Sequence, residues 1–201
     1  MKRLRISSHQ AFRGSDADTL LVELRKLARA QPGDAAVREQ LAMCLFNTLN
    51  AAKAEGDLAR RDALLVELRK LARVHPDDAA VREQLAMCLF NTLNAAKAEG
   101  SLTRRDALLV DLRNQARVHP DDAAAREQLA MSLLNTLNYA KAEGDLTRRD
   151  ALLAELRNLA RAYPDDIAGH CHIEQVKADF DRGEARLRHW NRVAGLSPGR
   201  Q

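Results

Sequence analysis

A motif of two asparagines and one lysine recurs three times in the chain at helical spacing. Its copies are Asn47/Asn50/Lys53, Asn91/Asn94/Lys97 and Asn135/Asn138/Lys141. A carboxamide both donates and accepts hydrogen bonds, so a row of them can bind the backbone or a carboxylate of an extended peptide. Asparagine is also a poor residue for a helix interior, which calls for an explanation of its repeated use. Hydrogen bonding between stacked repeats is the alternative explanation, and the sequence leaves both open.

Large apolar side chains are expected on the same helix face as these amides. At 100° per residue, Met87 and Phe90 fall on the side of Asn91, opposite a purely apolar side that includes Leu85 and Leu89. A solvated surface does not require Met or Phe, and flexible methionines suit contact with the apolar side chains of a partner. The sequence therefore predicts a peptide-binding face with these apolar contacts: Met43, Met87, Met131, Phe46, Phe90 and Leu134.

Catalytic chemistry is not predicted. The chain contains no P-loop, GxSxG, HExxH or GxGxxG motif. His75 and His119 precede prolines at expected helix ends, where a cation is mildly favourable, and the sequence supplies no partner for a catalytic base. We expect a protein that is not an enzyme, with no catalytic residue and no cofactor.

A metal site is not predicted either. His170, Cys171 and His172 are adjacent, so on a helix their side chains point about 100° apart and cannot converge on one ion. These positions belong to a polar last copy of the repeat, as a capping repeat requires. The three cysteines, Cys44, Cys88 and Cys171, form neither a CxxC pair nor an even set, which indicates a reducing cytoplasm.

The elements that must position these residues come from an internal repeat of 44 residues. Proline occurs at 32, 76, 120 and 164, and glycine at 56, 100 and 144. The copies that begin at Asp18 and Asp62 differ at six of 44 positions, and a fourth copy diverges after its proline. Units of this length bury their apolar faces against their neighbours, as in a solenoid.

Each copy predicts two helices. Asp57, Ser101 and Asp145 each follow a glycine that is expected to end a helix, and all three suit an N-cap. A leucine stripe then predicts a helix of about 17 residues that ends before the proline. A second helix of about 20 residues follows Pro76, with Asp77 and Asp78 expected in its first turn. Gln115 replaces Leu71 in the third copy and marks a half-exposed position.

Composition supports an all-α fold. The 201 residues are 46% apolar but only 3% aromatic, with the apolar content in Ala and Leu, which argues against a β-sandwich or barrel. The net charge of +4 lies mostly at the two ends, while acids and bases alternate along the helices, so nucleic-acid binding is disfavoured. No apolar run approaches the roughly 20 residues that cross a bilayer. We expect a soluble, unexported, cytoplasmic protein.

The copies resemble the tetratricopeptide repeat. Leu85 and Ala86, with Leu89 farther on, match that family's apolar and small positions, and Leu71-Ala72 before Pro76 matches its closing segment; the unit is ten residues longer. The resemblance implies a right-handed α-solenoid of about four helical hairpins. It also implies that the helix after the proline lines a concave groove, which would contain Met87, Phe90, Asn91, Asn94 and Lys97.

The predicted organisation has three parts: a basic segment over 1–17, four repeats over 18–180 and a capping helix with a tail over 181–201. Trp190 belongs to that last helix, which either packs on the fourth copy or forms a basic amphipathic segment. At the other end, the apolar side of the first helix is covered by Leu4, Ile6 and Phe12 or by another molecule.

These observations predict an interaction scaffold that binds a protein or peptide segment in its groove. The alternative is a structural spacer that forms homodimers or larger homo-oligomers through its open N-terminal face.

Overall fold

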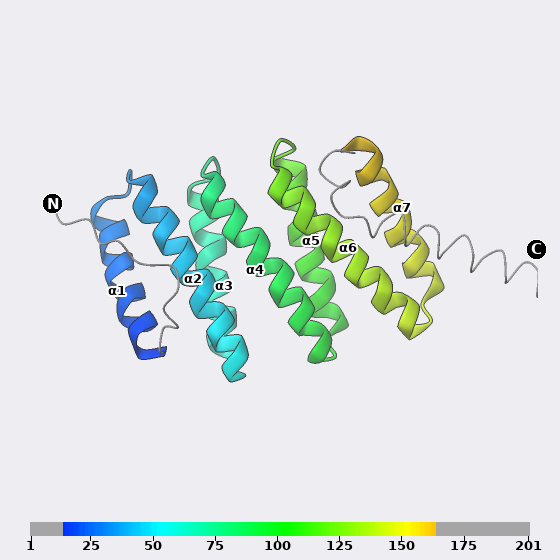
Figure 1. The fold of residues 1–201 in the computed structure, drawn as a ribbon, viewed down its shortest axis with the longest axis horizontal. Coiled ribbons are helices and arrows are strands. Elements are labelled where there is room, and N and C mark those ends of the chain that lie inside the picture. Colours follow the sequence, from blue (N-terminus) through cyan, green and yellow to red (C-terminus); the bar gives the residue numbers. More distant parts are fainter. Residues whose placement is uncertain (1–13, 164–201) are drawn as a thin grey trace, which may run out of the picture. The chain divides into compact units, whose positions relative to one another are not determined.

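The computed structural model describes residues 14–163, and these residues form seven helices and no strand (Figure 1). The predicted all-α class is therefore confirmed for this part of the chain. The helices are α1 (Gly14–Ala30), α2 (Ala35–Glu55), α3 (Leu58–Val74), α4 (Ala79–Ala98), α5 (Leu102–Val118), α6 (Ala123–Glu143) and α7 (Leu146–Ala162). The predictions for Leu4, Ile6, Phe12, His170, Cys171, His172 and Trp190 lie outside the described residues.

The helix ends follow the glycine and proline positions. Gly56 and Gly100 have φ of 75° and 67°, the left-handed conformation that a glycine adopts readily after a helix. Asp57 and Ser101 then cap α3 and α5, each accepting a bond from a backbone N–H three residues ahead, at 2.9 and 3.3 Å. The predicted helix of 17 residues before the proline is confirmed at α3.

The predicted position of the acidic residues after the proline was wrong. Helix α4 begins at Ala79, so Asp77 and Asp78 precede it rather than occupying its first turn. The Asp78 carboxylate instead accepts a hydrogen bond from the backbone N–H of Val81 at 3.3 Å. An aspartate at the N-cap satisfies a backbone donor that has no intrahelical partner, and this position requires the extended backbone observed there. The predicted length of about 20 residues is confirmed.

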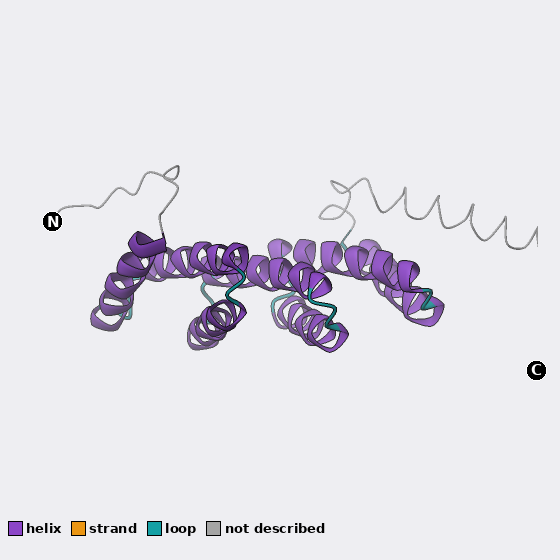
Figure 2. Ribbon diagram, turned by 90° about the horizontal axis from the view of Figure 1, so that it is seen from below, coloured by secondary structure: helices purple, strands orange, loops and turns teal. Residues whose placement is uncertain are grey.

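The structure divides into two units, 1–135 and 136–201, and the boundary falls inside α6. In the first unit, α2 packs against α1, α3 and α4, while α4 also packs against α3 and α5. The even-numbered helices α2 and α4 thus lie side by side, and α3 covers both from one side (Figure 2).

Leucines fill the core of the first unit. Leu45, Leu49, Leu68, Leu89 and Leu93 are almost completely buried, as the predicted apolar stripes require. Two free cysteines, Cys44 and Cys88, are buried with them. Burial raises the pKa of the Cys88 thiol to about 12, so this thiol stays protonated at neutral pH and behaves as a small apolar side chain.

In the second unit, residues 136–163 contain the end of α6 and all of α7. Gly144 again has a positive φ, 77°, and Asp145 caps α7 by accepting a bond from the Arg148 backbone N–H at 3.0 Å. Leu152, Leu153 and Leu156 are buried along one face of α7. No helix within the described residues combines the length and the apolarity that a bilayer span needs.

Candidate functional site

The predicted binding residues of α2 and α4 lie on one accessible surface of the first unit, which we call the amide face. Because α2 and α4 are neighbours, their Asn, Met and Phe side chains form two adjacent rows. Met43 is 44% exposed, and Met87 and Phe90 are half-buried. The amide face consists of Met43, Phe46, Asn47, Asn50 and Lys53 on α2, Met87, Phe90, Asn91, Asn94 and Lys97 on α4, and Met131, Leu134 and Asn135 on α6.

The remaining two predicted residues, Asn138 and Lys141, belong to the second unit. Both are exposed on α6. They continue the same sequence motif along the helix. Lys141 is exposed like the equivalent Lys53 and Lys97, whereas Asn138 is more exposed than the equivalent Asn50 and Asn94, which are half-buried.

Asparagines of neighbouring helices are hydrogen-bonded to each other. The Asn91 Nδ2 donates to the Asn50 Oδ1 at 3.3 Å, and the Asn135 Nδ2 donates to the Asn94 Oδ1 at 3.0 Å. In both cases the second asparagine of one copy pairs with the first asparagine of the next. Hydrogen bonding between repeats, the alternative left open by the sequence, therefore takes place at two junctions.

Each amide pair retains further hydrogen-bonding capacity. A carboxamide has two N–H donors and an oxygen with two lone pairs, and the bond between Asn91 and Asn50 uses one donor and one lone pair. The pairing also fixes the orientation of both side chains at a half-buried position. Support of the junction and contact with a ligand are thus compatible roles for the same residues.

Asn50 and Asn91 are expected to show energetic coupling in a double-mutant cycle. Alanine at either position should lower the free energy of unfolding, and the coupling between the two changes should be about 0.5–1.5 kcal/mol, the usual range for one hydrogen bond. Urea unfolding of the two single variants and the double variant measures it. Asn47→Ala is the control because Asn47 is exposed and begins the row. Additive effects of Asn50→Ala and Asn91→Ala would show that the bond contributes nothing.

Ion pairs link neighbouring odd-numbered helices, a feature that the sequence analysis missed. The Arg25 Nε on α1 donates to the Glu67 Oε1 on α3 at 2.8 Å, and the Arg69 Nη2 on α3 pairs with the Asp111 Oδ2 on α5. A second row runs in the opposite direction, from Arg60 to Asp18 and from Arg104 to Asp62. Opposite charges 42 residues apart, repeated after 44 residues, were the available signal in the sequence.

Two further ion pairs join the starts of the even-numbered helices. The Arg38 Nε donates to the Asp78 Oδ2 at 2.8 Å, and the Arg82 Nε donates to the Asp122 Oδ2 at 2.9 Å. Arg38 also donates to the backbone carbonyl of Pro32 at 2.9 Å. One arginine thus connects its own proline turn to the capping aspartate of the next copy, and this leaves α2 and α4 in a fixed register.

Arg61 is the one fully buried arginine among the largest buried side chains of the described residues. Its Nε donates to the Asp62 Oδ1 at 3.0 Å, and its guanidinium also pairs with Glu99 at the end of α4. Arg104 and then Arg61 lower the pKa of the Asp62 carboxyl through hydrogen bonds and charge. The contribution of Asp62 to stability is therefore present above its unfolded pKa and is lost as the pH falls through the lower folded pKa.

Residues 14–163 contain no group of three or more His, Cys, Asp or Glu side chains placed to hold a metal ion. Comparisons with protein-family models, with curated proteins and with solved structures found no match to this chain.

Proposed function

We propose that this chain is a cytoplasmic, non-enzymatic scaffold that binds a protein or peptide segment on its amide face. The proposal includes the finer architecture: tetratricopeptide-like hairpins, about four in number, stacked as a right-handed solenoid, with the amide face along the groove. The observation that carries it is the pair of adjacent rows on α2 and α4, in which accessible Met and Phe side chains are followed by amides that hydrogen-bond between the two helices.

The two kinds of side chain have separate roles in this proposal. The bond between Asn50 and Asn91 leaves further donors and acceptors on both amides. These groups form hydrogen bonds to the backbone of an extended or helical partner segment. Met43 and Met87 contact its apolar side chains and adapt to their shape. Because the rows repeat from helix to helix, a longer segment gains the same contacts again on the next helix.

The test uses the methionines, since they take no part in the bonds between repeats. Peptides selected from a random displayed library against the wild-type chain should bind the Met43→Gln, Met87→Gln double variant about tenfold more weakly. Circular dichroism should show an almost unchanged melting temperature, because Met43 is exposed and Met87 half-buried.

The matched control places the same substitution on exposed apolar residues of the odd-numbered helices. Val66 and Val110 are 61% and 47% exposed on α3 and α5, away from the amide face. Val66→Gln with Val110→Gln should leave peptide binding unchanged. Failure to select any peptide, or equal binding by both double variants, would overturn the proposal.

Self-association through α1 is the second candidate function. Leu27 on α1 is 42% exposed, whereas the equivalent Leu71 on α3 is half-buried, because α3 has a preceding odd-numbered helix beside it. Similarly, among the residues that the structure describes, Glu23 pairs only with Lys26 on its own helix, while the equivalent Glu67 pairs with Arg25 on α1. Light scattering tests this candidate: a monomer mass that is independent of concentration would rule it out, and a dimer that Leu27→Lys dissociates would support it.

A further inference from the structure

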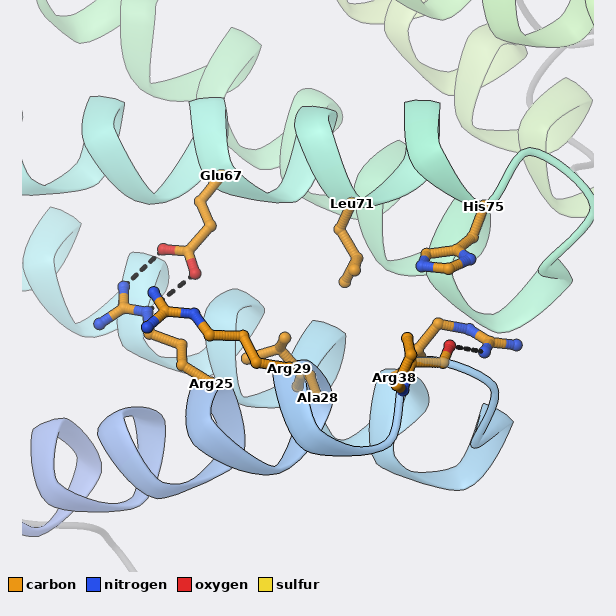
Figure 3. A pocket seen from close by; sticks show the side chains of 9 residues that line it. Arg25, Ala28, Arg29, Arg38, Glu67, Leu71 and His75 are labelled. Atoms are coloured by element: carbon orange, nitrogen blue, oxygen red, sulfur yellow. Dashed lines mark hydrogen bonds and ion pairs between the residues drawn. The ribbon is translucent and has the colours of Figure 1, made fainter.

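A groove runs between α1 and α3 on the side of the molecule formed by the odd-numbered helices. Its main hollow has a volume of about 400 Å³, within the usual range of ligand sites. A smaller hollow of about 190 Å³ shares Arg25, Arg29, Leu41, Glu67 and Leu71 with it and extends to His75 (Figure 3). The main hollow is lined by Arg25 and Arg29 from α1, Leu41 and Leu45 from α2, and Glu67, Lys70, Leu71 and Val74 from α3.

The groove combines an apolar floor with an excess of positive charge. Leu41 and Leu45 of α2 form the floor, and Leu71 lies on the α3 wall. Of the charged groups, Arg25 is neutralised by Glu67 through two hydrogen bonds. Arg29 and Lys70 lie on opposite helices, both are exposed, and neither forms an ion pair within residues 14–163. Two unneutralised cations therefore flank a leucine-lined floor.

We propose that this groove binds an acidic, aliphatic peptide segment, at a surface separate from the amide face. Carboxylates of the segment pair with Arg29 and Lys70, one on each helix, and an aliphatic side chain between them contacts Leu41 and Leu71. The charge of the groove selects against basic segments, and its floor selects against small inorganic anions, which gain nothing from leucine.

The equivalent positions of the next repeat provide an internal comparison. In the third copy, Asn114 takes the place of Lys70 and Gln115 takes the place of Leu71. The Gln115 Oε1 is buried and accepts no hydrogen bond. A carboxylate offers only acceptors at neutral pH, so it cannot satisfy this oxygen. The groove between α1 and α3 therefore has the acidic-peptide site, and the equivalent groove between α3 and α5 lacks it.

The experiment exchanges these two residues between the copies. Fluorescence anisotropy with a fluorescein-labelled pentapeptide of alternating glutamate and leucine measures binding to the full chain. Lys70→Asn with Leu71→Gln should weaken binding about tenfold, because it removes one ion pair and one apolar contact. The reciprocal change, Asn114→Lys with Gln115→Leu, should raise the stoichiometry from one peptide to two.

Controls separate this proposal from structural effects and from the amide face. The exchanged residues already occur at equivalent positions of the chain, so both variants should fold, which circular dichroism checks. If the Lys70→Asn, Leu71→Gln variant does not fold, the single variant Lys70→Asn provides the test because Lys70 is exposed. Met43→Gln with Met87→Gln should bind the acidic pentapeptide as the wild type does.

Three results would overturn the proposal. The first is no binding of the pentapeptide to the wild-type chain, and the second is equal binding after the exchange of Lys70 and Leu71. The third is equal affinity for a pentapeptide of alternating lysine and leucine, or complete competition by inorganic phosphate at the same concentration as the peptide.

Discussion

Replacement of Arg61 by alanine is expected to lower the free energy of unfolding by about 3 kcal/mol. The Arg61 side chain is completely buried, and its removal leaves Glu99 and Asp62 with Arg104 as their remaining cation at the α3–α4 hairpin. The estimate lies at the low end for a broken buried pair because both carboxylates retain contact with water. Urea unfolding followed by circular dichroism measures the change.

The adjacent residue is the matched control. Arg60 belongs to the same helix, but its side chain is 27% exposed and its partners Asp18 and Glu55 are more than half exposed. Arg60→Ala should therefore cost less than about 1 kcal/mol. Equal losses for the two variants would show that burial of Arg61 does not determine its importance. Arg61→Lys, which keeps the charge but not the planar fork, should fall between them.

Leu68→Ala is expected to have a similarly large effect, about 3 kcal/mol. Leu68 is fully buried on α3, which packs against both α2 and α4, so the cavity left by the missing methyl groups has little freedom to collapse. The same urea unfolding experiment applies, with an unchanged dependence on urea concentration expected, since the surface exposed on unfolding stays the same.

Leu58 offers a comparison on the same helix with the same substitution. It is 44% exposed at the start of α3. Leu58→Ala should change the free energy of unfolding by less than about 1 kcal/mol. If Leu68→Ala is no more harmful than Leu58→Ala, α3 does not form part of the core of the first unit.

The sequence was sufficient to predict the helices because their ends depend on local chemistry. Glycine at 56 and 100 adopts a positive φ, and Asp57 and Ser101 cap the helices that follow. The aspartates after the proline were misplaced by a few residues. A helix N-cap and a first turn both favour acidic residues, so only the backbone conformation of Asp78 distinguishes them.

The side of the helices that carries the amide face could be predicted from the sequence, but the hydrogen bonds between its asparagines could not. Helical periodicity separates buried Leu89 from half-exposed Met87 without any tertiary information. In contrast, the bond between Asn50 and Asn91 depends on how far α2 is shifted and rotated against α4, which no local pattern specifies. The ion pair between Arg25 and Glu67 was not predicted for the same reason, since its separation of 42 residues differs from the repeat length of 44.

The ion pairs and amide bonds between repeats make the copies interchangeable modules. Excision of residues 62–105 would place Arg25 opposite Asp111 and Asn50 opposite Asn135, the same kinds of partner that meet at the existing junctions. Unequal recombination between the near-identical coding segments would therefore shorten or lengthen the protein by whole copies while conserving each contact. Evolution can adjust the span of such a protein in discrete steps without redesigning an interface.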